Sequence, residues 1–185
     1  MNAPYRYNRP RRERHGRVPT PAGPGAVLLT AIVLAGCSGA SLPQPVPENA
    51  QNPIEIHAED LTPDVMVKAT NEAMSAIGIP LLQSDRKRAY VESKWVDVSQ
   101  YIQASAEAYP RRERVIQMQV QLMRPDSTGA RRIAVKAVYR PYGIDVARQH
   151  DRLVPTDHPG YQLAMRVARQ VRLQLIENNV TVNNG

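Results

Sequence analysis

The sequence contains no phenylalanine, one tryptophan and one cysteine, and each scarcity limits what the chain can build. Without phenylalanine, a hydrophobic core must come from Val, Ile, Leu, Met, Ala and Tyr. One cysteine excludes an intrachain disulfide framework and a zinc site made of several cysteines. No apolar run reaches the roughly 18 to 20 residues that a membrane-spanning helix requires. The 185 residues, 42% of them apolar, suffice for one domain with appendages.

The amino-terminal region has the pattern of a secretory signal peptide. Residues 1–25 contain six arginines and one acidic residue, and the apolar run AVLLTAIVLAG follows over residues 26–36. A basic segment ahead of an apolar run of about 7–15 residues is typical of such peptides, and this run is too short to cross a bilayer. The run leads into a motif that resembles the bacterial lipobox, which the lipoprotein signal peptidase cleaves: Leu34-Ala35-Gly36-Cys37.

The resemblance implies a lipid anchor. In lipoproteins of this kind the peptidase recognises the residues that match Leu34, Ala35 and Gly36, the cysteine receives a diacylglyceryl group, and the new amino terminus is acylated. Residues 1–36 would then be removed and Cys37 would hold the protein on a membrane, because two or three acyl chains anchor durably. The alternative is a soluble secreted protein in which Cys37 is a chance or core cysteine.

Removal of the leader changes the expected partners. Residues 1–36 hold six of the 24 Lys and Arg residues and one of the 17 Asp and Glu residues, which leaves 18 basic and 16 acidic residues. The formal net charge falls from +7 to +2, so we expect no nucleic-acid partner. Ser38 follows the cysteine where enterobacterial lipoproteins retained in the inner membrane have Asp. The resemblance therefore implies an outer-membrane lipoprotein that faces the periplasm, with the inner membrane and the cell surface as alternatives.

A tether and one domain follow the cysteine. The segment after Cys37 contains four prolines up to residue 53 and almost no large apolar side chains, which favours polyproline II and cannot form a core. The sequence therefore predicts a lipidated cysteine and tether over 37–53, a single domain over 54–178 and a flexible polar tail over 179–185.

Within the domain, the pattern predicts two helices and four strands. Thr62 and Pro63 mark the start of a helix that ends at Ile77, before Gly78, and Asp157 is expected to cap a second helix over 158–176. A short edge strand is indicated at 54–56, and the segment 99–111 matches no single element. The main strands are predicted over residues 79–84, 89–98, 112–124 and 133–139.

Strict alternation in the last two strands is typical of an antiparallel sheet that is covered on one side. The expected fold is α+β: a two-layer sandwich in the order α-β-β-β-β-α, with a four-stranded antiparallel sheet and two helices on one face. The segment from Thr62 to Trp95 and the order of elements resemble envelope lipoproteins of the outer-membrane assembly type, such as the C subunit of the β-barrel assembly machinery with its helix-grip modules. The resemblance implies fold class and location, and no binding residues.

No pattern in the sequence points to catalysis, and no cofactor is expected. The chain has no glycine-rich phosphate loop and no GxSxG or HExxH motif. One region holds four candidate metal ligands, but their spacing matches no standard site: His150, Asp151, Asp157 and His158. A metal-dependent hydrolase is therefore an alternative, and we assign no catalytic, cofactor-binding or metal-binding residue.

The polar face of the last two strands is the best candidate for binding, either to a partner protein or to an anionic glycan. It comprises Gln117, Gln119, Gln121, Lys136 and Arg140. An ordinary solvated face is the alternative, and alternation places Trp95 in the core. We expect a non-enzymatic protein-interaction module for envelope assembly or maintenance, with an envelope protein as partner. A carrier that holds a lipid or glycan between sheet and helices is the second interpretation, and the sequence leaves the oligomeric state open.

Overall fold

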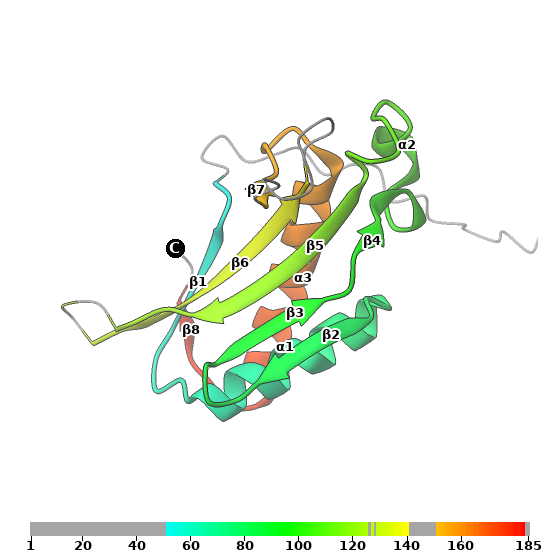
Figure 1. Cartoon of the computed structure of the whole chain (residues 1–185). Helices are drawn as coiled ribbons and strands as arrows, with labels where there is room; N and C mark the ends of the chain where they lie inside the picture. Colours follow the sequence, from blue (N-terminus) through cyan, green and yellow to red (C-terminus); the bar gives the residue numbers. More distant parts are fainter. Residues whose placement is uncertain (1–50, 126, 128, 141–150, 184–185) are drawn as a thin grey trace, which may run out of the picture. The chain divides into compact units, whose positions relative to one another are not determined.

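Helices α1 (Pro63–Ile77) and α3 (Pro159–Glu177) lie side by side across one face of an antiparallel sheet in this computed structural model (Figure 1). The structure describes residues 51–125, 127, 129–140 and 151–183. Two short helices, η1 (Val98–Gln100) and α2 (Gln103–Ala106), form in the first part of the segment that the sequence did not assign. The strands are β1 (Ile54–Ala58), β2 (Leu81–Asp85), β3 (Tyr90–Ser93), β4 (Val96–Asp97), β5 (Val115–Leu122), β6 (Arg131–Tyr139), β7 (Arg152–Leu153) and β8 (Val182–Asn183).

Among the described residues, all eight strands belong to one sheet. Its main order is β2-β3-β5-β6-β1-β8, β4 pairs with β5, β7 pairs with β6, and every pair is antiparallel. The predicted α+β class and antiparallel sheet are therefore confirmed, whereas the predicted four-stranded sheet is wrong. The predicted order α-β-β-β-β-α leaves out β1, which was indicated only as a short edge strand, and β7 and β8, which have two residues each. The predicted strand over 89–98 forms two strands, β3 and β4.

The position of β1 and the structure of the carboxyl-terminal tail also differ from expectation. Strand β1 was expected at an edge, but it lies between β6 and β8. Strand β8 belongs to the tail that the sequence predicted to be flexible, and Val182 pairs with Ala58 of β1. The N–H of Glu59 donates to the carbonyl of Thr181 at 3.0 Å, which extends this pairing by one backbone bond.

Local sequence explains where the two long helices begin and end. The hydroxyl of Thr62 accepts a hydrogen bond from the N–H of Val65 at 3.3 Å, and Gly78 ends α1 in the left-handed conformation that glycine adopts without strain. Helix α3 begins one residue later than predicted. His158, not Asp157, is its N-cap, because the imidazole Nδ1 accepts from the N–H of Gly160 at 2.9 Å.

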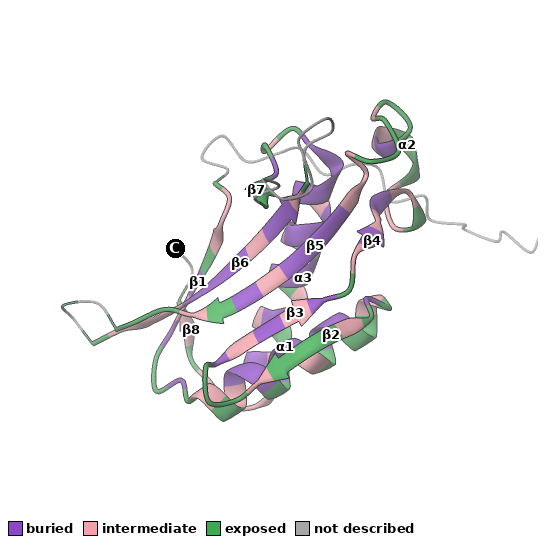
Figure 2. Cartoon of the chain, viewed as in Figure 1, coloured by how far each residue is buried: buried purple, intermediate pink, exposed green. Residues whose placement is uncertain are grey.

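The core lies between the sheet and helices α1 and α3. Figure 2 shows buried residues along both β5 and β6, whereas β2 at the sheet edge is largely exposed. Methionine fills irregular spaces well, which suits a core that has no phenylalanine. The fully buried side chains between the layers include Met66, Met74, Met118, Leu163 and Leu175.

Candidate functional site

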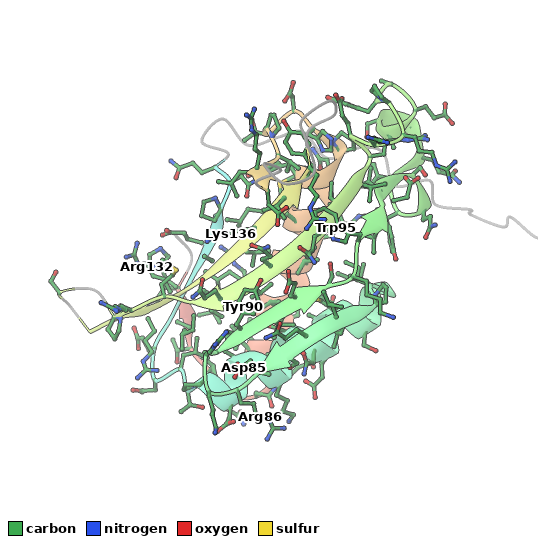
Figure 3. All side chains as sticks on the ribbon, viewed as in Figure 1. Asp85, Arg86, Tyr90, Trp95, Arg132 and Lys136 are labelled. Atoms are coloured by element: carbon green, nitrogen blue, oxygen red, sulfur yellow. The ribbon has the colours of Figure 1, made fainter. Side chains whose placement is uncertain are left out.

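The face of the sheet that points away from α1 and α3, called the open face from here on, carries the residues that the sequence singled out for binding. Side chains alternate along a strand, so β5 turns its even-numbered residues toward the helices and its odd-numbered residues toward the open face. Figure 3 looks onto this face and labels four of its residues. The open face comprises Tyr90, Glu92, Trp95, Gln117, Gln119, Gln121, Arg132, Ala134, Lys136, Val138 and Arg140.

The three glutamines of β5 share this face but differ in exposure. Gln121 is exposed, Gln119 is half-buried, and Gln117, which was expected to face solvent, is only 3% exposed. The amide of Gln117 donates to the carbonyl of Ser93 at 3.0 Å. The hydroxyl of Ser93 in turn accepts from the N–H of Met118 at 2.9 Å. Gln117 therefore joins β5 to the end of β3 and is not an outward contact residue.

Trp95 lies on the open face and not in the core, because a β-bulge precedes it. Glu92 pairs with Gln119, and Val96 pairs with Ile116. The chain therefore advances four residues from β3 to β4 while β5 advances only three, which leaves one extra residue before Val96. One extra residue in a strand shifts every later side chain to the opposite face. The N–H of Lys94 donates to the carbonyl of Pro80 at 2.8 Å, which holds the bulge against the residue before β2.

Arg140 lies over Trp95 at one end of the open face. The guanidinium carbon is 4.6 Å from the centroid of the indole ring, within the range of a cation–π contact. The Nε atom of Arg140 donates to the carboxylate of Asp151 at 3.0 Å. The aromatic ring and the carboxylate thus fix the guanidinium plane, while about half of the Arg140 side chain stays exposed.

Tyr90 and Glu92 lie at the β3 side of the open face. Burial raises the pKa of Tyr90 to about 12, and the negative charge of Glu92, its hydrogen bond with the phenol and the charge of Asp151 act in the same direction. The phenol therefore stays protonated at neutral pH. Half-buried aromatic rings, amides and both signs of charge make this face suited to binding a polar surface.

Sequence reasoning placed Trp95 on the wrong face and considered Asp151 only as a metal ligand, not as the partner of Arg140. For Trp95, the polar pair Ser93-Lys94 interrupts the strand and is the one sequence signal of the bulge. Lys136 is half-buried and Arg140 is exposed.

Three of the four candidate metal ligands, Asp151, Asp157 and His158, lie among the described residues, and they form no metal-holding group there. His150 lies outside the described residues, and Asp151 pairs with Arg140. Both ring nitrogens of His158 are occupied: Nδ1 accepts from Gly160, and Nε2 is 2.8 Å from the carbonyl of Glu113, to which it donates. Burial lowers the pKa of His158, against the opposing effects of Glu113 and Asp157. In the part of the chain that the structure describes, no three His, Cys, Asp or Glu side chains form a group able to hold a metal ion.

The lipobox residues Leu34, Ala35, Gly36 and Cys37 lie outside the described residues. Within the described ranges, no helix has the length and apolar character needed to span a bilayer. No protein-family model matches the chain, and comparison with the curated proteins finds no match either.

Proposed function

We propose that the chain is a lipoprotein anchored through acylated Cys37 in a bacterial outer membrane, and that its domain is a non-enzymatic module of envelope assembly or maintenance. The domain faces the periplasm and docks an envelope protein on its open face. The sequence Leu34-Ala35-Gly36-Cys37 after a basic and apolar leader supports the anchor. The docking role rests on one observation: half-buried Tyr90 and Trp95 lie with Arg140 on a sheet face to which neither long helix packs. Tyrosine, tryptophan and arginine are the residues most enriched at binding hot spots.

Two observations favour a protein partner over a sugar or lipid. Arg140 occupies a face of the Trp95 ring, the kind of surface on which a sugar would stack. The space between sheet and helices, where a carrier would hold its ligand, is filled by fully buried side chains such as Met66, Met118 and Leu163. Binding on the open face is therefore the better-supported interpretation.

The anchor is tested by mass spectrometry of the full-length chain expressed in a Gram-negative host. We expect a mature amino-terminal peptide that begins at Cys37 and carries the mass of a diacylglyceryl group and an acyl chain. The variant Cys37→Ala should retain residues 1–36 and should lose the acyl groups. An intact leader or an unmodified thiol in the exported wild-type protein would contradict the anchor.

The docking face is tested by photocrosslinking in intact cells. A photoreactive residue at Gln121 should give discrete protein adducts, and Lys136→Glu in the same chain should weaken them. A photoreactive residue at Glu177, exposed at the end of α3, is the matched control and should give none of these adducts. Equal adducts from both positions, or lipid adducts alone at Gln121, would remove the docking proposal.

A further inference from the structure

The middle of the open face carries opposite charges on the two sides of β5. Gln119 pairs with Glu92 of β3 on one side and with Lys136 of β6 on the other. The three side chains form a row across the sheet, with acid, amide and base in that order. Neighbouring strands lie about 4.8 Å apart, so the acidic and basic residues of the row are separated by roughly 10 Å at the backbone.

In the next row, the residues on the two sides of β5 differ in size. Gln121 pairs with Tyr90 on the β3 side and with Ala134 on the β6 side. A large aromatic residue therefore lies on one side of β5 and a small one on the other. The amide of the central strand again lies between them.

The polarity continues past the bulge. Val115 pairs with Asp97 of β4, and Arg140 follows Tyr139, the partner of Ile116. At this end the charged groups have partners within the chain: Arg140 pairs with Asp151, and Asp97 accepts from the N–H and the hydroxyl of Ser99. Arg140 and Trp95 stay partly exposed and border the contact, whereas the unpaired acid and base lie in the row centred on Gln119.

Two copies of this face have complementary charges when a two-fold axis relates them in one particular orientation. Consider a second open face laid on the first, related by a two-fold axis that runs between the faces close to the direction of β5. The axis exchanges the two sides of β5, so Glu92 of each copy meets Lys136 of the other, and Gln119 and Gln121 meet their own counterparts. Tyr90 of each copy lies above the position of Ala134, which is only 1% exposed in its own chain and is therefore not a contact residue. An axis perpendicular to β5 would place Glu92 on Glu92 and Lys136 on Lys136. Charge therefore selects the first axis, and two-fold dimers with such isologous contacts are the commonest oligomers.

We propose that the open face binds the open face of a second copy of this chain, with Glu92 of each protomer paired to Lys136 of the other. The inference rests on the proposed function in that it uses the same docking surface and names its partner. Among the described residues, neither Glu92 nor Lys136 forms an ion pair within its own chain. The Glu92 carboxylate accepts a hydrogen bond from the Tyr90 phenol, which leaves its negative charge without a cationic partner. Packed sheets lie about 10 Å apart, a distance that Glu and Lys side chains bridge together.

The periphery of the two rows does not oppose this arrangement. Asp85 and Glu55 flank the row centred on Gln121, and the axis would bring Asp85 of one copy toward Glu55 of the other. Each has a cationic partner in its own chain: Asp85 is 3.7 Å from Arg88, and Glu55 is 3.2 Å from Arg132. Sheet twist also separates the corners of two packed sheets, so the contact is concentrated on the central rows.

The test is a charge exchange in full-length chains that carry two different carboxyl-terminal tags. Wild-type copies co-expressed in one host should co-purify after detergent extraction. Glu92→Lys paired with itself places lysine against Lys136, and Lys136→Glu paired with itself places glutamate against Glu92. Because like charges in contact are strongly unfavourable, each should reduce co-purification by about tenfold or more. The mixed pair, Glu92→Lys with Lys136→Glu, restores two opposite-charge contacts and should co-purify again.

The matched control is Lys87→Glu, an equal charge reversal on the exposed β2–β3 turn, which should co-purify as the wild type does. Recovery in the mixed pair also shows that both variants fold. Failure of the wild-type copies to associate, or failure of the mixed pair to recover, overturns the dimer. If that happens while Gln121 still crosslinks to a different envelope protein, the proposed function stands and only its partner is wrong. If neither association nor crosslinking is found, both proposals fall.

Discussion

The Nδ1 atom of His158 accepts a hydrogen bond from the N–H of Gly160 at 2.9 Å, and this bond fixes the first turn of α3. Because Nδ1 is the acceptor, the ring proton is on Nε2, which donates to the carbonyl of Glu113 at 2.8 Å. The imidazole therefore joins α3 to the segment before β5. The ring also packs against Tyr109, with ring centroids 4.8 Å apart.

This arrangement predicts that the protein loses stability as the pH falls through the range in which histidine titrates. Burial lowers the pKa of His158 below its ordinary value of 6.5, so the unfolded state binds a proton more readily than the folded state. Stability is then constant above about pH 6.5 and falls below it, down to the lowered pKa of the folded state. The measurement is the urea midpoint at about pH 7.5 and pH 5.5.

One variant tests the role of His158. His158→Asn keeps a side-chain oxygen at the N-cap but does not titrate, so the difference between the urea midpoints at the two pH values should shrink. A difference in His158→Asn as large as in the wild type would contradict the assignment to His158.

Gly160 is required because α3 approaches β5 closely at its first turn. A Cβ atom added there would lie 2.9 Å from Nδ1 of His158 and 3.1 Å from both Cδ1 and Cγ2 of Ile116. We expect Gly160→Ala to lower the free energy of unfolding by about 1–3 kcal/mol through overpacking. Adding Ile116→Val removes one of the three contacts, so the double variant should lose less than the sum of the single losses. Strict additivity in urea unfolding would contradict this explanation.

The parts of the fold that the sequence predicted are those with a local cause. Helix α1 has a hydroxyl cap, a proline at its first position and a glycine after its end, and all three act within a few residues. Strands β5 and β6 are eight and nine residues long, which is enough for the alternation of apolar and polar residues to be recognised in the sequence. Strands β7 and β8 have two residues each and form through pairings with β6 and β1, which no local pattern records. For β1, the sequence indicated the strand but not its place between β6 and β8.

The candidate site was predicted less well, for a related reason. Alternation correctly assigned Gln119, Gln121 and Lys136 to the polar face. It does not report what neighbouring strands place over that face, so the burial of Gln117 was missed. It also assumes an unbroken strand, and the one-residue bulge before Val96 therefore moved Trp95 to the face opposite to the expected one.

The difference between Gln117 and Gln121 should be measurable. Removing the Gln117 amide leaves the carbonyl of Ser93 without this partner in a buried position, so Gln117→Ala should cost about 1–3 kcal/mol of unfolding free energy. Gln121 is exposed, and Gln121→Ala should change the free energy of unfolding by less than about 0.5 kcal/mol. Thermal or urea unfolding of both variants decides the matter. Equal and small effects would mean that all three glutamines form one solvated row.

The contact between Arg140 and Trp95 gives a direct optical signal, because Trp95 is the only tryptophan in the chain. Arg140→Ala uncovers one face of the indole, so the fluorescence emission should shift to longer wavelength and acrylamide should quench it more strongly. Asp151→Asn keeps the guanidinium but loses its charged partner, and should give a smaller change in the same direction. Stability should fall by only about 0.5–1 kcal/mol, as for other exposed cation–π pairs. Arg86→Ala, which removes an exposed arginine from the β2–β3 turn, is the control and should leave the spectrum unchanged. If Arg140→Ala behaves like this control, Arg140 does not cover Trp95 in solution, and the indole is then available to stack on a sugar.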